Sequence, residues 1–168
     1  EIGSSSGKRV AVIGAGPTGL SAAYFLRRAG HEVSLLDRNE SPGGRLLEEP
    51  SAETLPPEVL RAEIDAIMRV GIQWQPSTEI ADAAALEQLL DSYDAVLVAA
   101  GAAAIDMAGP WSLEASPRGI AVDKGTYQTS RDRVFAAGNA VRKKGLVVRS
   151  VADGKEAAGV IDSVLATG

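Results

Sequence analysis

A glycine-rich segment between two short apolar runs constrains this chain more than any other feature of its sequence. The segment is 14–19, and its glycines have the spacing Gly-x-Gly-x-x-Gly. It follows the apolar run 8–13 (KRVAVI), which is typical of a strand buried on both faces. Residues 20–29 then carry apolar side chains at helical intervals and stop at Gly30, and residues 31–36 return to a strand pattern. The sequence therefore predicts a β-α-β unit with the glycine segment at its first turn.

Each glycine of this segment has its own task in a dinucleotide-binding unit. Gly14 permits the tight turn, Gly16 lets the backbone approach a pyrophosphate, and Gly19 lets the helix pack on the strand. The helix that follows directs free N–H groups and the positive end of its dipole toward the phosphates. Asp37 comes 18 residues after Gly19, at the end of the second strand, where an acid accepts hydrogen bonds from ribose hydroxyls. The combination predicts a dinucleotide site, and the alternative is a glycine turn without a ligand.

The rest of the chain alternates helical and strand patterns. It predicts helices over 56–70, 82–90 and 150–166, strands over 72–75, 94–100 and 134–137, a long loop over 41–57, and a short hairpin between 120 and 127. This alternation indicates an α/β fold with a Rossmann-like, doubly wound, mostly parallel sheet and a small β-hairpin addition.

The length of the chain corresponds to one domain, and we expect that domain to span residues 8–168. Residues 1–7 (EIGSSSG) are typical of a flexible linker or a tag remnant. Because the first residue is Glu1 and not methionine, we expect the chain to begin within a longer protein.

Composition excludes several kinds of chemistry. The formal charge is −5, from 17 basic and 22 acidic side chains, so the sequence lacks the broad basic field that nucleic acid requires. The absence of cysteine excludes disulfides, thiol nucleophiles and cysteine-bound metal clusters. The single histidine, His31, cannot form a histidine-rich metal site, and we expect it to be exposed and without a catalytic role.

No apolar run approaches the length needed to cross a bilayer, so we expect a cytoplasmic protein without a membrane partner. No pair of side chains is suited to acid–base catalysis, and we assign no catalytic residue and no metal ligand. Redox chemistry in such a chain has to come from a cofactor.

Further segments, taken in order, extend the evidence beyond the glycine segment. They are VAVIGAGPTGLSAAYFLRRAGHEVSLLD, the PGGRL loop, LPPEVLRAEIDAIMRVGI, YDAVLVAAGA, and QTSRDRVFAAGNAV followed by LVVRSVADGKEAA, and together they reach from about Lys8 to Ala158. In order and spacing they resemble the FAD-dependent pyridine-nucleotide oxidoreductases, above all the small subunit of NADPH-dependent glutamate synthase and its relatives. The resemblance implies a glutamate synthase-like flavoprotein domain, that is, an FAD-binding oxidoreductase domain that takes part in electron transfer.

The resemblance also implies which residues meet each part of FAD. The pyrophosphate would meet Gly14, Ala15, Gly16, Pro17 and Thr18, with Ala100 and Gly101 nearby; the adenosine would meet Asp37, Arg38 and Ile80; a covering loop would supply Gly44, Arg45 and Leu46; and the ribityl chain and flavin would meet Gly138, Asn139, Val147 and Val148. The last two residues would bring a helix N-terminus toward the flavin, whose reduced form carries negative charge.

The chain departs from the family pattern at Asn139, where the late motif normally carries aspartate. An amide still accepts a hydrogen bond from a ribityl hydroxyl but loses its charge-assisted part, about 1–2 kcal/mol. We therefore expect weaker retention of FAD. This departure keeps open a second hypothesis, a non-catalytic structural subunit that retains the fold. A third is a one-domain NAD-binding module, since Asp37 suits an unphosphorylated ribose.

A larger departure is a missing domain. The family inserts an NAD(P)H-binding domain where this chain has only the short connection 101–119, and no second Gly-x-Gly-x-x-Gly occurs. Without it, we expect the chain not to oxidise NAD(P)H autonomously, because the nicotinamide would not be held against the flavin. We also expect the loss to expose apolar surface near residues 101–112, including Trp111, where a homodimer or a partner subunit would attach.

Overall fold

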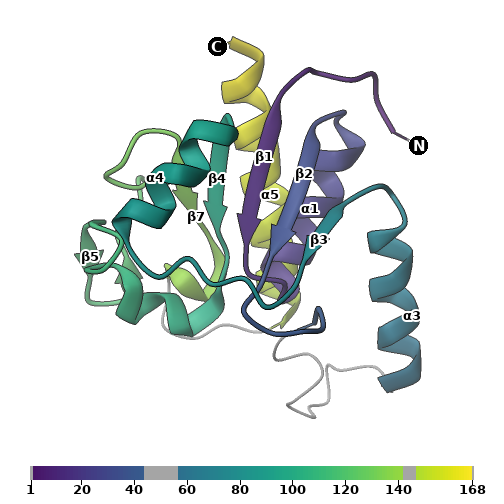
Figure 1. The fold of residues 1–168 in the computed structure, drawn as a ribbon, viewed down its shortest axis with the longest axis horizontal. Helices are drawn as coiled ribbons and strands as arrows, with labels where there is room; N and C mark the ends of the chain where they lie inside the picture. Colours follow the sequence, from purple (N-terminus) through teal and green to yellow (C-terminus); the bar gives the residue numbers. More distant parts are fainter. Residues whose placement is uncertain (1, 44–56, 142–146, 168) are drawn as a thin grey trace.

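The computed structural model describes residues 2–43, 57–141 and 147–167. Among these residues, five strands form one parallel sheet in the order β3-β2-β1-β4-β7 (Figure 1). The strands are β1 (Arg9–Ile13), β2 (Glu32–Leu36), β3 (Gln73–Gln75), β4 (Ala95–Val98) and β7 (Val134–Ala136). The central strand, β1, pairs with β2 on one side and β4 on the other, so the order of the strands reverses there. This is the Rossmann-like, doubly wound α/β arrangement that the sequence predicts.

Helices cover both faces of this sheet. On one face, the core includes α1 (Pro17–Arg28), α3 (Pro57–Met68) and α5 (Val147–Thr167); on the other lie α4 (Ala83–Ser92) and the 3-10 helix η1 (Gly101–Met107). Val10 and Val12 of β1 point to the first face, and Ala11 and Ile13 point to the second. Because all four are buried, β1 requires the continuous apolar run that its sequence shows. No helix in the described ranges has the length and apolar character needed to cross a membrane.

Helices α1 and α5 lie side by side on the first face (Figure 1). A Cβ on Gly154 of α5 would lie 2.8 Å from the Cβ of Ser21 in α1, so a larger residue would force the helices apart. The Ser21 hydroxyl donates to the carbonyl of Val151 at 2.7 Å. Since both helices follow the carboxyl ends of parallel strands, their N-termini lie at the same edge of the sheet.

The boundaries of the helices agree with the sequence patterns to within a few residues. α1 begins at Pro17, earlier than the apolar spacing predicts, because a first-turn proline lacks only an N–H that the helix would leave free. Gly30 follows its end with a φ of +103°, as expected of a C-terminal glycine. Asp82 is the N-cap of α4, since its carboxylate accepts from the N–H of Ala85 at 2.9 Å.

The hairpin lies earlier than predicted. The expected position between residues 120 and 127 is wrong: the antiparallel pair is β5 (Ala115–Ser116) with β6 (Gly119–Ile120), and residues 123–127 form a turn. Proline at position 117 presets the backbone of the tight connection, and the Ser116 hydroxyl accepts from the N–H of Arg118 at 3.2 Å. This proline is the sequence feature from which the position of the hairpin could have been predicted, because it marks the turn between the two strands.

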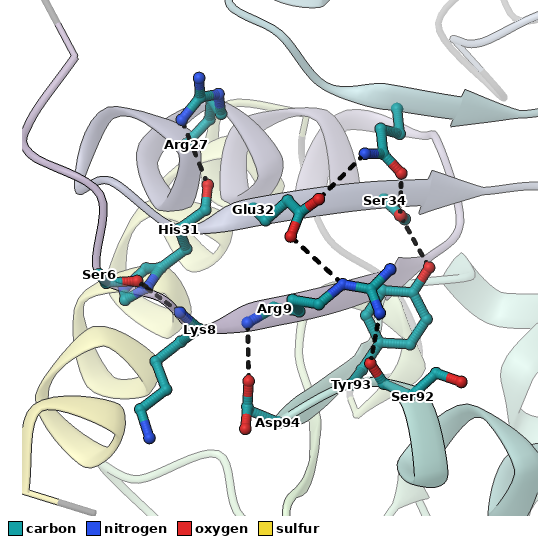
Figure 2. A network of polar contacts seen from close by, with 11 residues as sticks. Ser6, Lys8, Arg9, Arg27, His31, Glu32, Ser34, Ser92, Tyr93 and Asp94 are labelled. Atoms are coloured by element: carbon teal, nitrogen blue, oxygen red, sulfur yellow. Dashed lines mark hydrogen bonds and ion pairs between the residues drawn. The ribbon is translucent and has the colours of Figure 1, made fainter.

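Polar contacts join the strands at their amino-terminal ends (Figure 2). The backbone N–H of Arg9 donates to Asp94 at 2.8 Å, and its guanidinium forms an ion pair with Glu32 at 3.3 Å. That guanidinium also lies 4.6 Å from the centre of the Tyr93 ring, whose hydroxyl donates to Ser34 at 2.8 Å. This network is at the opposite edge from the glycine segment, and we assign it a structural role.

His31 is buried rather than exposed, with 2% of its surface accessible. Its Nε2 lies 2.7 Å from the carboxylate of Asp162 in α5, and its Nδ1 lies 2.7 Å from the hydroxyl of Ser6. The N–H of Gly3 also donates to the carbonyl of Arg28 at 2.7 Å. The expectation of an exposed histidine is therefore wrong, because the N-terminal segment and α5 both cover it. Residues 3–6 attach to the fold more closely than their composition predicts.

Candidate functional site

The loops after β1, β2, β4 and β7 meet at the carboxyl edge of the sheet (Figure 1). The connections after β1 and β4 leave in opposite directions, since these neighbouring strands belong to the two halves of the sheet. In open α/β sheets, ligands bind in the crevice at this reversal point. The glycine segment follows β1 and therefore lies at that point.

The three glycines of the segment face different surroundings. Gly14 has a φ of +108°, and a Cβ there would lie 2.5 Å from the carbonyl oxygen of Ala99. A Cβ on Gly19 would overlap the carbonyl oxygen of Gly14. In contrast, a Cβ on Gly16 would meet no atom within 4 Å. The fold itself thus requires glycine at 14 and 19, whereas the space beside Gly16 remains open for a ligand that approaches the backbone.

The N-terminus of α1 suits an anion. Its N-cap residue, Gly16, makes no side-chain capping bond, and the first turn contains no acidic residue. Pro17 occupies the first turn, and Arg27 and Arg28 in the last turn complement the negative end of the helix dipole. The free N–H groups of the first turn therefore offer positive partial charge to a phosphate.

Asp37 lies half-buried beside the glycine segment. One carboxylate oxygen, Oδ2, accepts from the N–H of Ala15 at 2.8 Å, and the other, Oδ1, accepts from the N–H of Asn39 at 2.8 Å. A carboxylate has about four acceptor positions, so two remain for ribose hydroxyls. Arg38, the next residue, is exposed. The structure thus places Asp37, the acidic residue predicted to bind the ribose, against the glycine segment predicted to bind the pyrophosphate.

Thr18 faces away from this open space. Its hydroxyl is buried and donates to the carbonyl of Ser150 in α5 at 3.0 Å. Gly138, with a φ of +71°, packs on that hydroxyl so closely that a Cβ would overlap it. Only the backbone of Thr18 is therefore suited to the predicted pyrophosphate contact, and its side chain connects α1 to α5 and to the loop after β7.

Other predicted residues lie at the same edge. Ala100 and Gly101 follow β4, and the Cα of Ala100 is 2.6 Å from the position that a Cβ on Gly14 would take. Gly101 has a φ of +72°, and a Cβ there would meet nothing within 4 Å. Asn139 belongs to the 3-10 helix η2 (Gly138–Ala140) after β7, and residues 147 and 148 begin α5. Predictions for Gly44, Arg45 and Leu46 lie outside the described residues.

Ile80 and Trp111 form a contact that sequence reasoning missed. The indole Nε1 of Trp111 donates to the carbonyl oxygen of Ile80 at 2.7 Å, and both residues are buried. Ala104 and Ala108 are also buried, because η1 folds back onto the second face of the sheet. The expected exposed apolar surface near 101–112 is therefore wrong for these alanines and for Trp111.

Comparisons with known proteins identify the family of this chain. The family model of the pyridine nucleotide-disulphide oxidoreductases matches residues 2–154. The beta subunit of NADP(+)-dependent formate dehydrogenase from Moorella thermoacetica is 40% identical over 97 residues, which are 58% of this chain and 14% of that protein. The small chain of NADPH glutamate synthase from Escherichia coli K12 is 38% identical over 96 residues, which are 57% of this chain and 20% of that protein. The matched segment thus spans a fifth or less of these relatives' own length.

Solved structures show the same fold. A thioredoxin reductase from Gloeobacter violaceus superposes with a TM-score of 0.69 at 14% identity, over 95% of each chain. A thioredoxin reductase from Lactococcus lactis superposes with a TM-score of 0.68 at 13% identity, over 96% of this chain and 100% of that one. The family match covers most of the sequence, and the glycine segment and sheet order agree with it. This chain therefore belongs to the pyridine nucleotide-disulphide oxidoreductase family.

Proposed function

We propose that this chain is the FAD-binding domain of an oxidoreductase, through which electrons pass between a donor and an acceptor held elsewhere. The observation that carries the proposal is the open space beside Gly16, at the uncapped N-terminus of α1 and next to Asp37. A pyrophosphate and its adjoining ribose require these two features side by side.

The described residues fit FAD at three points. The backbone of Gly16 and the first turn of α1 would hold the pyrophosphate, and the free acceptor positions of Asp37 would hold the ribose. The N-terminus of α5 is held at the same edge through Thr18, where its dipole would favour negative charge on a reduced flavin. When bound, FAD supplies the hydride and electron transfer that the protein side chains lack.

The donor of electrons would come from another subunit or domain. The sequence contains one Gly-x-Gly-x-x-Gly segment, and η1 with the β5-β6 hairpin occupies the connection between β4 and β7. The relatives in formate dehydrogenase and glutamate synthase are named as a subunit and a small chain. We therefore propose that a partner subunit supplies the NAD(P)H site, at a surface other than the buried side chains of η1.

A one-domain NAD-binding module is the second candidate. The same Asp37 carboxylate would accept from the unphosphorylated ribose of NAD, and the sequence contains a single Gly-x-Gly-x-x-Gly segment for one dinucleotide. A structural subunit without flavin is the third, motivated by Asn139.

The visible absorption spectrum of the purified protein tests these candidates first. Flavin bands that survive gel filtration and release free FAD on denaturation would establish the proposed function. If the protein is colourless, titration calorimetry with FAD and with NAD follows. Binding of NAD without FAD selects the second candidate, and binding of neither selects the third. The G16A variant is the control, because a methyl group there would meet the ligand but no protein atom.

A further inference from the structure

A short strap, defined as residues 77–80, crosses the carboxyl edge of the sheet between β3 and α4 (Figure 1). It has no helix or strand of its own. At one end, the N–H of Ser77 donates to the carbonyl of Asn39 at 3.0 Å, and the N–H of Thr78 donates to the carbonyl of Asp37 at 2.8 Å. The strap is thus attached to the residue whose carboxylate faces the glycine segment.

The other end of the strap is attached to η1 and its continuation. The carbonyl oxygen of Ile80 accepts from the indole Nε1 of Trp111 at 2.7 Å, in a buried contact. Trp111 is itself held, since its backbone N–H donates to the carbonyl of Met107 at 2.9 Å and only 3% of its surface is exposed. The indole therefore joins the strap to the segment that follows β4.

We propose that Trp111 is a positioning residue for the nucleotide, because its indole N–H holds the strap beside Asp37. The inference rests on the proposed function, which places the pyrophosphate at Gly16 and the ribose at Asp37. A nucleotide that runs from its pyrophosphate at Gly16 to its ribose at Asp37 has its base beyond Asp37. The strap is the segment whose N–H groups bond to the backbone carbonyls of Asp37 and Asn39. Ser77 has a φ of +49°, a conformation that a non-glycine residue adopts at some cost, so the strap depends on its bonds at both ends.

The apolar ring of Trp111 alone does not hold the strap, since the contact with Ile80 is a hydrogen bond from the indole N–H. A phenyl ring would still belong to the apolar cluster on the second face of the sheet, which also contains Leu86, Val98 and Ile120, but it has no hydrogen-bond donor. Without the indole N–H, the buried carbonyl of Ile80 would lose its partner, and a buried unpaired carbonyl is costly enough to shift the strap toward water. The proposed role therefore lies in one N–H group.

The test compares Trp111→Phe with Tyr93→Phe. Each variant removes one hydrogen-bond donor and keeps an aromatic ring, but Tyr93 donates to Ser34 in the amino-terminal network, away from the site. Two quantities are measured: the Kd for ADP by calorimetry, and the hydrogen-exchange rates of the Ser77 and Thr78 amides by NMR. ADP is the probe because it contains the base, ribose and pyrophosphate without a flavin.

We expect Trp111→Phe to weaken ADP binding roughly ten-fold, equivalent to about 1.4 kcal/mol, and to speed exchange at Thr78. Tyr93→Phe should lower stability and leave both quantities unchanged. Equal ADP affinity and equal exchange in Trp111→Phe and the native protein would overturn the inference. If Trp111→Phe does not fold, β-(3-benzothienyl)alanine at position 111 replaces only the N–H with sulfur and gives the same comparison.

Failure of the proposed function is a distinct result. If the native protein binds neither FAD nor ADP, the proposed function fails, and the nucleotide part of the inference fails with it. If the native protein binds ADP, and Trp111→Phe binds it equally well with unchanged amide exchange, only the inference fails.

Discussion

The carboxylate of Asp37 accepts a hydrogen bond from the backbone N–H of Ala15 at 2.8 Å. The residue expected to bind the ribose therefore also fixes the loop expected to bind the pyrophosphate. This double role makes the effect of mutating Asp37 larger than the loss of one ligand contact.

Asp37→Ala should weaken FAD binding roughly 100-fold, since it removes charge-assisted bonds worth about 1.5–3 kcal/mol. Asp37→Asn keeps an acceptor for the N–H of Ala15, and it should weaken FAD binding only about ten-fold. Asp94→Ala is the matched control, because Asp94 also accepts from a backbone N–H, that of Arg9, at the opposite edge. It should cost stability and leave the Kd for FAD, measured by calorimetry, unchanged. Equal loss of affinity in the two alanine variants would contradict the assignment.

Gly16→Ala and Gly19→Ala should separate ligand binding from folding. A methyl group on Gly16 meets no protein atom, so its cost in unfolding free energy should stay below about 1 kcal/mol, while FAD binding is lost. A methyl group on Gly19 overlaps the carbonyl of Gly14, and relieving that overlap should cost about 3 kcal/mol or more. Urea unfolding and FAD titration measure the two effects. A strongly destabilised Gly16→Ala would show that the space beside Gly16 serves packing.

Asn139→Asp should strengthen FAD binding. The added charge would turn the expected bond to the ribityl chain into a charge-assisted one, with a gain of about 1–2 kcal/mol, or roughly ten-fold in Kd. Affinity for ADP should not change, since ADP lacks the ribityl chain. A similar gain for both ligands would indicate a general electrostatic effect and would argue against the ribityl contact.

His31→Ala should destabilise the fold without affecting the site. It removes a buried ring and its contacts to Ser6 and Asp162, and a loss of about 3 kcal/mol is expected. Ser6→Ala should cost about 1 kcal/mol, and the double variant should cost less than the sum, because the two side chains share one bond. Urea unfolding gives these values, and the Kd for ADP should stay within two-fold, roughly the scatter of a distant substitution. Additive losses would show that Ser6 and His31 are not coupled.

Local patterns were sufficient to predict the fold. The apolar run of β1, the spacing of the glycines and the alternation of helices with strands each follow from short-range physical requirements. The role of Gly19 could also be predicted, because it concerns the nearby carbonyl of Gly14, whereas the contact of Gly14 with Ala99 joins distant parts of the chain.

Long-range contacts could not be predicted. His31 is buried by Ser6 and by Asp162, which is 131 residues away, and no local pattern signals that pairing. Thr18 was expected to meet the pyrophosphate, but its side chain lies in the core against Ser150 and Gly138. Trp111 was expected near the surface, and its actual partner, Ile80, comes from a segment without regular structure.

The packing of α1 against α5 has a consequence for how the protein folds. The glycine segment is synthesised before the helix that supports it, because Ser150 of α5 comes 132 residues after Thr18 in the chain. The sheet shows the same delay, because β1 pairs with β4, more than 80 residues later in the chain. Contacts between such distant segments slow folding, since chain entropy is lost before they form. A ribosome-bound chain that has not yet released α5 should therefore lack a formed nucleotide site, although its entire glycine motif has long been synthesised.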